Sequence, residues 1–146
     1  MPHSDRDIDT LARTIWGEAR NQGREGMIAV AWCVRNRVDM DLHNDGKPDW
    51  WGEGYAGVCL RKRQFSCWDP GDANEPYLRG RKPIPGREYA QAHEAALAAV
   101  HAYEPDPTGG ATHYYNPKAV RKTPAWVPGS TRTVQIGAHI FFRDVP

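Results

Sequence analysis

The chain contains little cysteine and has almost no net charge. Its 146 residues include only Cys33, Cys59 and Cys67, an odd number that argues against a disulfide scaffold. We expect free, mostly buried thiols, with a Cys59–Cys67 bridge as the alternative if the protein works outside a reducing compartment. Nineteen Lys and Arg residues against eighteen Asp and Glu residues leave a net charge of +1. This balance offers no general electrostatic basis for binding nucleic acid.

Long apolar runs are also missing. No stretch approaches the roughly 20 apolar residues that cross a bilayer, so we expect no membrane insertion. Residues 1–9, MPHSDRDID, lack the basic and then apolar layout of a secretory signal. We therefore expect a protein that is synthesised in the cytoplasm without a signal peptide. The length predicts a single domain over residues 1–146, and we expect it to be a monomer.

Helical spacing of apolar residues dominates the first forty residues. Ser4 followed by Asp7 forms a weak capping-box pattern, and the spacing after it predicts a helix over residues 5–18. Asn-Gln-Gly at residues 21–23 interrupts the pattern, and the same spacing then predicts a second helix over residues 24–38.

The middle of the chain alternates between loops and helices. Residues 39–57 and 70–86 are rich in Pro, Gly and Asp, which predicts two long surface loops. A short helix is predicted between them over residues 58–63. The longest helix is predicted to begin at Gly86 and to be stopped by Pro105.

The tail has a different character. THYY at residues 112–115 and QIGAHIFFR at residues 135–143 contain β-prone residues, and the second segment alternates. We expect two or three short antiparallel strands.

Glu18, in TIWGEAR at residues 14–20, is the first candidate for chemistry. It stands beside a glycine at the end of the first predicted helix, where a side chain can project into a cleft. A general acid for a glycosidic oxygen must stay protonated near neutral pH, and burial among aromatic neighbours such as Trp16 and Trp32 disfavours the charged form. An exposed helix glutamate is the alternative.

Glu25, seven residues further on, is the candidate second carboxylate. A retaining glycosidase needs two carboxyls about 5 Å apart, and an inverting one needs about 6.5–9.5 Å. The interruption at residues 21–23 leaves this separation open. The other interpretation of Glu25 is a residue favoured by the helix dipole at a helix start.

Two further segments mix aromatic rings with amides and hydroxyls. Such mixtures suit an uncharged amphipathic ligand such as an N-acetylated sugar, although core packing explains the tyrosines equally well. The candidate substrate-binding residues in QFSCW and GATHYYNP are Gln64, Phe65, Ser66, Tyr114, Tyr115 and Asn116. Trp126 and His139 are added as candidate cleft residues, with a satisfied strand histidine as the alternative for His139.

Metal and cofactor sites are not expected. Residues 41–46 resemble the opening of a calcium loop, but position twelve falls on Gly52 where a bidentate Glu is needed. His113 and His139 lack the HExxH or paired CxxC spacing of a zinc site. No GxSxG elbow or phosphate-binding glycine loop appears.

Taken in order, several of these segments resemble the SleB/CwlJ family of cell-wall hydrolases. The likeness covers about Leu11 to Arg143 and is carried by ARTIWGEARNQGREGMIAVAWCVRNRV, QFSCW, GATHYYNP, a later Trp and IGAHIFFR. The family implies an α+β, lysozyme-like fold that is mainly helical with a small antiparallel β-sheet. Its catalytic glutamate falls on Glu18, and the glutamate that begins the next helix falls on Glu25.

The resemblance implies an enzyme whose partner is the glycan strand of peptidoglycan. The expected reaction is cleavage of the β-1,4 bond between N-acetylmuramic acid and N-acetylglucosamine by a lytic transglycosylase, with Glu18 as general acid and base. The alternatives are a muramidase, a metal-dependent N-acetylmuramoyl-L-alanine amidase and a non-catalytic wall-binding module. The stand-alone layout suggests a phage or prophage endolysin that acts on the wall in the periplasm after release.

Overall fold

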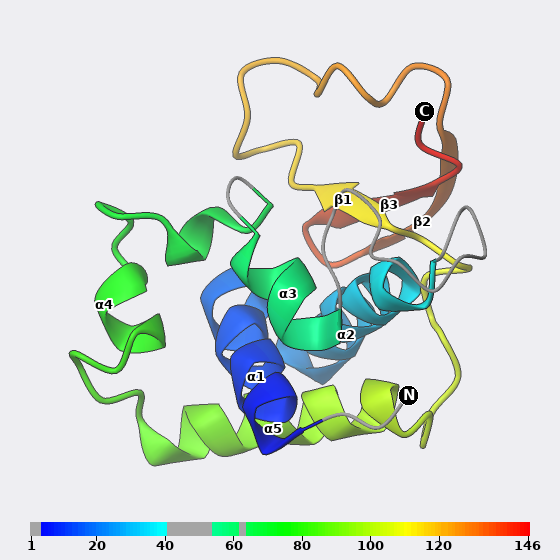
Figure 1. Cartoon of the computed structure of the whole chain (residues 1–146). Helices are drawn as coiled ribbons and strands as arrows, with labels where there is room; N and C mark the ends of the chain where they lie inside the picture. Colours follow the sequence, from blue (N-terminus) through cyan, green and yellow to red (C-terminus); the bar gives the residue numbers. More distant parts are fainter. Residues whose placement is uncertain (1–3, 41–53, 62–63) are drawn as a thin grey trace.

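The computed structural model describes residues 4–40, 54–61 and 64–146. In this part of the chain a group of helices carries a small sheet on one side (Figure 1). The helical elements are α1 (Asp5–Ala19), α2 (Gly23–Asp39), α3 (Gly54–Leu60), the 3-10 turn η1 (Ser66–Trp68), α4 (Glu75–Leu78) and α5 (Gly86–Val100). The sheet contains β1 (His113–Tyr115), β2 (Thr131–Ile136) and β3 (His139–Arg143). The predicted α+β class, mainly helical with a small antiparallel sheet, is confirmed.

Helix α1 begins at the predicted capping box. The Asp7 N–H donates to Ser4 Oγ at 3.1 Å, and the Ser4 N–H donates back to Asp7 Oδ2 at 3.0 Å. These reciprocal bonds satisfy amide groups that a helix start otherwise leaves unpaired. The helix ends at Ala19, one residue beyond the prediction, so Glu18 lies in its last turn.

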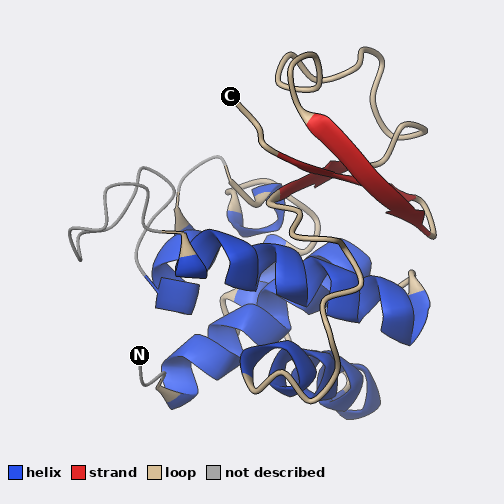
Figure 2. Cartoon of the chain, turned by 90° about the vertical axis from the view of Figure 1, so that its right-hand side faces the viewer, coloured by secondary structure: helices blue, strands red, loops and turns tan. Residues whose placement is uncertain are grey.

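Helix α2 runs through the middle of the helical part. It packs against α1, α3 and α5, and small residues such as Ala31 are fully buried in the helical core. Figure 2 shows the sheet lying beside these helices. None of the helices in the described ranges is long and apolar enough to cross a membrane.

Helix α5 is shorter than predicted. It ends at Val100, because Ala102 adopts a left-handed φ of 53° and the Tyr103 N–H donates to Ala98 O at 2.9 Å. This is the hydrogen bond of a Schellman-type helix end. Pro105 therefore lies beyond the helix, and α2, with 17 residues against 15 in α5, is longer.

Both long loops were predicted too broadly. Helix α3 already begins at Gly54 and ends at Leu60, so its first residues fall in the segment predicted as loop, and the predicted end at residue 63 lies outside the described residues. Residues 75–78 form a single helical turn, α4, inside the second predicted loop. The calcium-like pattern at residues 41–52 lies outside the described residues.

The sheet is antiparallel, with β3 between β1 and β2. The alternating segment at residues 135–143 is not one strand, because the chain reverses at Gly137, which has a φ of 58°, and the Ala138 N–H donates to Gln22 Oε1 at 2.9 Å. Strand β2 instead extends back to Thr131, a start that the sequence did not reveal. Side chains of both alternating sets in β3 are buried.

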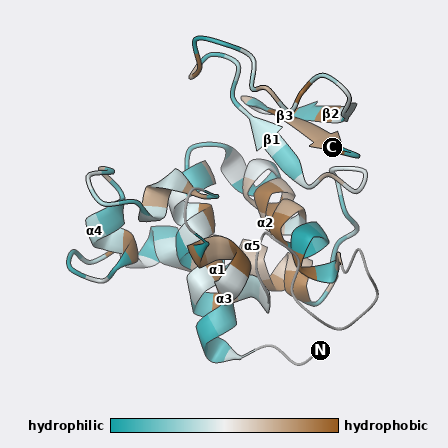
Figure 3. Ribbon diagram, turned by 45° about the horizontal axis from the view of Figure 1, so that its top comes forward, coloured by the Kyte–Doolittle hydropathy of each residue, from teal (hydrophilic) through white to brown (hydrophobic). Residues whose placement is uncertain are grey.

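The two faces of the sheet carry different aromatic groups. On one face the ring of Tyr114 contacts the rings of His139 and Phe141, and this face packs against Ala29 and Cys33 of α2. The other face carries Tyr115, Trp126 and Phe142, whose ring centroids lie 5.2–6.0 Å apart. Hydrophobic stretches are visible on α2 and on β3, whereas the loop that leaves β1 is mostly hydrophilic (Figure 3).

Candidate active site

Glu18 is a partly buried carboxyl in the last turn of α1. Burial is the largest influence on its pKa and raises it above the ordinary value of 4.5. Hydrogen bonding from Tyr114 and from Cys67 opposes this rise. The carboxyl therefore retains its proton at pH values at which an exposed glutamate is ionised.

Tyr114 provides the aromatic neighbour of this carboxyl. Its ring centroid lies 4.8 Å from that of His139 and 5.5 Å from that of Phe141. Burial, followed by the nearby Glu18, raises the pKa of the Tyr114 hydroxyl well above 10. The hydroxyl is therefore neutral and able to donate a hydrogen bond to the Glu18 carboxylate. Trp16 and Trp32 were the expected neighbours. The Trp16 Nε1–H donates to Glu88 of α5 at 3.0 Å, and the Trp32 ring lies 4.6 Å from the Arg35 guanidinium.

Cys67 reaches Glu18 because Gly17 leaves room for it. A Cβ atom at Gly17 would lie 2.8 Å from Cys67 Cβ and 3.0 Å from Cys67 Sγ. Cys67 is buried and unpaired, as are Cys33 and Cys59, which confirms the prediction of free thiols. Burial, together with the charge of Glu18, raises the pKa of the Cys67 thiol, so it stays protonated beside the carboxyl.

Arg37 is a buried cation that joins three parts of the site. Its Nε–H donates to Thr112 O at 2.5 Å, its Nη1–H donates to Gln64 Oε1 at 2.6 Å, and its guanidinium lies 5.2 Å from the Phe65 ring centroid. No carboxylate of the described residues forms a salt bridge with it. Its charge lowers the pKa of Glu18, against the effect of burial.

Asp72 adds a negative charge at the same carboxyl. The Asn74 N–H donates to Asp72 Oδ1 at 2.8 Å, and Asn74 Nδ2 donates to Gly17 O at 3.3 Å, which docks this loop beside the end of α1. The charge of Asp72 raises the pKa of Glu18. Asp72 is therefore a carboxylate whose charge acts on Glu18, and the role of Glu25 as a second carboxylate stays a prediction.

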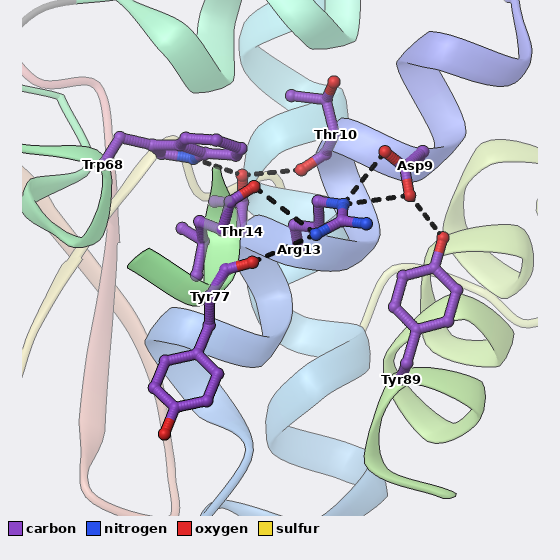
Figure 4. Close-up of polar contacts among 8 residues, drawn as sticks. Asp9, Thr10, Arg13, Thr14, Trp68, Tyr77 and Tyr89 are labelled. Carbon is purple, nitrogen blue, oxygen red and sulfur yellow. Dashed lines mark hydrogen bonds and ion pairs between the residues drawn. The ribbon is translucent and has the colours of Figure 1, made fainter. Parts of the chain in front are cut away.

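Helix α1 is held in place by hydrogen bonds one to three turns before Glu18 (Figure 4). Trp68 Nε1–H donates to Thr14 Oγ1 at 2.9 Å, and Thr14 in turn donates to Thr10 O at 2.8 Å. On another face Arg13 pairs with Asp9 at 3.0 Å and donates to Tyr77 O at 3.1 Å. These bonds join η1 and α4 to α1, so Cys67, which stands in η1, is positioned by the same helix that carries Glu18.

The structure divides the predicted substrate-binding residues into separate groups. Gln64 is held by Arg37, Phe65 is buried in the core, and Ser66 is exposed. His139 lies with Tyr114, and its buried Nδ1 has no hydrogen-bond partner among the described residues. The pKa of His139 is lowered by burial, so the ring is neutral.

The remaining predicted residues lie away from this group. Tyr115 and Trp126 belong to the other face of the sheet, and Asn116 Oδ1 accepts from the Lys118 N–H at 2.9 Å in a turn. Glu25 is exposed at the start of α2 and lines a pocket with Glu104 and Ile136. The binding roles of all these residues stay predictions.

Three residues of the site were not singled out from the sequence: Arg37, Cys67 and Asp72. Arg37 and Cys67 stand inside NRV and QFSCW, two of the segments that carried the resemblance. The sequence therefore marked these segments but assigned no role to the two residues. Asp72 had no signal beyond its position in a loop. His113 and His139 belong to no group of three or more potential metal ligands among the described residues.

Comparison with known proteins shows the family to which this chain belongs. The profile of the Cell Wall Hydrolase family matches residues 21–142, most of the chain, beginning three residues after Glu18. The chain belongs to this family.

Two solved structures and several curated relatives agree with the assignment. The catalytic domain of the germination-specific lytic transglycosylase SleB from Bacillus anthracis has a TM-score of 0.69 and 30% identity, over 98% of this chain and 100% of that one. The catalytic domain of the Bacillus cereus SleB protein has a TM-score of 0.68 and 27% identity, over 97% and 93%. The match to the SleB catalytic domain confirms the predicted fold.

Spore cortex-lytic enzymes are the curated relatives. That of Oceanobacillus iheyensis is 31% identical over 140 residues, and that of Bacillus subtilis is 30% identical over 138 residues. These matches cover 95% and 94% of this chain but only 42% and 38% of the relatives. The chain thus spans less than half the length of the relatives it matches.

Proposed function

We propose that this member of the Cell Wall Hydrolase family is a peptidoglycan lytic transglycosylase. It cleaves the β-1,4 bond between N-acetylmuramic acid and N-acetylglucosamine and forms a 1,6-anhydro sugar. The observation that carries this proposal is the position of Glu18, a half-buried carboxyl in the last turn of α1 that Tyr114 and Cys67 contact by hydrogen bonds and whose pKa is raised by burial. Similarity to the catalytic domain of a lytic transglycosylase supports it.

In the proposed reaction Glu18 acts twice. Its proton passes to the glycosidic oxygen as the C1–O bond breaks and positive charge develops at C1 of the muramic residue. The C6 hydroxyl of the same residue then bonds to C1, and its proton returns to the Glu18 carboxylate. No water is consumed, and the enzyme ends in its starting protonation state.

The neighbours of Glu18 stabilise either its protonated or its ionised state. Burial and the charge of Asp72 favour the protonated acid, whereas Tyr114, Cys67 and Arg37 favour the carboxylate that exists between the two proton transfers. Asp72 and the carboxylate also provide negative charge for the developing oxocarbenium ion, a form of preorganised electrostatic stabilisation. The site thus supports both halves of the reaction with one acid–base group.

Muramidase activity is the second candidate, because Asp72 supplies a further carboxylate at Glu18. In that reaction water would attack C1 and the product would be a reducing sugar. The proposal also includes action on the cell wall after release and an origin as a phage or prophage endolysin. A monomeric state stays a prediction, which gel filtration tests.

Mass spectrometry of muropeptides released from purified sacculi tests the reaction. A transglycosylase releases disaccharide products one water lighter than those of a hydrolase. The matched variant is Glu18→Gln, which retains shape but has no proton to transfer, and its lytic rate should fall by at least about 10²–10⁴-fold. Reducing products would favour the muramidase, and near-normal lysis by folded Glu18→Gln would refute the role of Glu18.

A further inference from the structure

The sheet region of the chain has an unbalanced charge. Residues 107–143 contain no Asp or Glu, yet they carry five basic residues: Lys118, Arg121, Lys122, Arg132 and Arg143. The fourteen other basic residues share the rest of the chain with all eighteen acidic residues. The net charge of the whole chain is therefore close to zero although residues 107–143 form a basic region.

Five of the eleven described basic residues before position 107 form salt bridges with acidic neighbours. Arg13 pairs with Asp9 at 3.0 Å, Arg24 with Glu94 at 2.7 Å and Arg35 with Asp39 at 3.3 Å. Such pairs keep a local charge from acting on a distant ligand.

Four basic residues of the sheet region stand in a stretch of sequence that offers them no acidic neighbour. Lys118, Arg121, Lys122 and Arg132 are exposed, and none forms a salt bridge with a carboxylate of the described residues. Arg143 pairs with Asp144 at 3.5 Å and is not counted with them. We refer to the four unpaired residues as the basic cluster.

The basic cluster begins four residues after Tyr114, which contacts Glu18. Lys118 follows Tyr114, the neighbour of Glu18, by four residues, a distance that even an extended chain limits to about 14 Å. The start of the segment is ordered by a turn, in which Asn116 Oδ1 accepts from the Lys118 N–H at 2.9 Å and Asn116 O accepts from the Ala119 N–H at 3.0 Å. The loop between β1 and β2, which contains Lys118, Arg121 and Lys122, extends from the sheet on the side away from the helices (Figure 1).

We propose that the basic cluster binds the free carboxylates of the peptide stems on the glycan strand. This inference rests on the proposed function, because a strand positioned for cleavage at Glu18 brings its peptide-bearing muramic residues within reach of the cluster. The stem carboxylates are repeated along the strand, and unpaired Lys and Arg side chains complement them. The cluster would thus select peptide-bearing strands over bare glycan.

A charge-matched pair of variants tests the proposal by binding alone. One protein carries Lys118→Gln, Arg121→Gln and Lys122→Gln, and the control carries Arg6→Gln, Arg61→Gln and Arg87→Gln, three exposed residues of the helical part. Both variants, and the parent with which they are compared, also carry Glu18→Gln so that the sacculi are not degraded during the assay. Cosedimentation uses purified Gram-negative sacculi, which present stem carboxylates without a phosphate polymer. The first variant should bind about tenfold more weakly than the parent. The control variant should bind nearly as well as the parent.

Chemical amidation of the stem carboxylates provides the second arm. On amidated sacculi the parent should bind about tenfold more weakly than on untreated sacculi. The difference in affinity between the two variants should then vanish. Equal binding by both variants, or a difference that persists on amidated sacculi, would overturn the proposal. A difference seen only on walls that carry phosphate polymers would also overturn it and assign the cluster to phosphate.

The failure of this inference is distinguishable from failure of the proposed function. If the protein with Glu18 intact lyses sacculi but the cluster variant binds like its control, only the stem-binding proposal fails. If the protein with Glu18 intact neither lyses nor binds sacculi, both fail. Circular dichroism of the two variants provides the check on folding.

Discussion

Gly17 and Cys67 are packed so closely that the glycine cannot carry a side chain without movement. A Cβ atom at Gly17 would lie 2.8 Å from Cys67 Cβ and 3.4 Å from Leu78 Cδ1. This contact brings η1 against the last turn of α1 and places the Cys67 thiol beside the carboxyl of Glu18. The glycine before Glu18 therefore determines how the site is assembled.

We expect Gly17→Ala to destabilise the protein and to reduce lysis. Overpacking of a core contact costs about 1–3 kcal/mol, which exceeds the roughly 0.5–1 kcal/mol that Ala contributes in a helix. Thermal unfolding and the rate of sacculus lysis measure the two effects. Gly86→Ala is the control, because a Cβ atom there meets nothing within 4 Å. A Gly17→Ala protein as stable and active as the Gly86→Ala protein would contradict this account.

The raised pKa of Glu18 predicts that the carboxyl destabilises the folded protein at neutral pH. The folded state holds this proton more tightly than the unfolded state, whose value is near 4.5, so stability falls as the pH rises from 4.5 through the raised pKa. Glu18→Gln removes the ionisation. Its melting temperature should exceed that of the parent at pH 7, and the difference should shrink below pH 4.5. Melting curves across this range check the prediction, and a pH-independent difference would refute it.

Arg37 is expected to act on both stability and the pH profile. Arg37→Met removes the donor to Thr112 O and to Gln64 Oε1, and a buried carbonyl that stays unsatisfied costs about 1–3 kcal/mol. It also removes the charge that lowers the pKa of Glu18, so the alkaline limb of kcat/KM should move to higher pH.

Arg37→Lys separates these two effects. It retains the charge but loses the planar arrangement of donors, so it should be destabilised while the alkaline limb stays in place. The pH profiles of both variants, measured below their melting temperatures, provide the test. An alkaline limb at the same pH in the Arg37→Met and Arg37→Lys variants would show that the charge of Arg37 does not influence Glu18.

Asp72 and Glu25 should respond differently to the loss of their charges. Asp72→Asn retains the acceptor for the Asn74 N–H but removes the charge that raises the pKa of Glu18, so the alkaline limb should move to lower pH. Glu25→Gln, an exposed change in a pocket with Glu104, should leave the profile and rate nearly unaltered. Comparable loss from Glu25→Gln, with reducing sugars as products, would instead indicate a two-carboxylate hydrolase.

Local features of the molecule were predictable from the sequence. Helices α1 and α2 were found almost to the residue, because their apolar spacing and the Ser4–Asp7 capping box act within a few residues. The position of Glu18 at the end of α1 followed from the same pattern, and the conspicuous motifs led to the family. Helix α5 was extended too far because its end depends on a left-handed Ala102, a conformation that side-chain patterns do not signal.

The surroundings of Glu18 were decided by the tertiary structure. Tyr114 comes from a strand almost a hundred residues away, and Arg37 and Cys67 come from two other elements. Tyr114 and Tyr115 look equivalent in the sequence, but adjacent strand residues point to opposite faces, so only Tyr114 meets the carboxyl. The sequence by itself determined which carboxyl stands at a helix end. The burial and charges that set its pKa exist only after distant segments pack together, because desolvation and Coulomb interactions depend on distance in space and not along the chain.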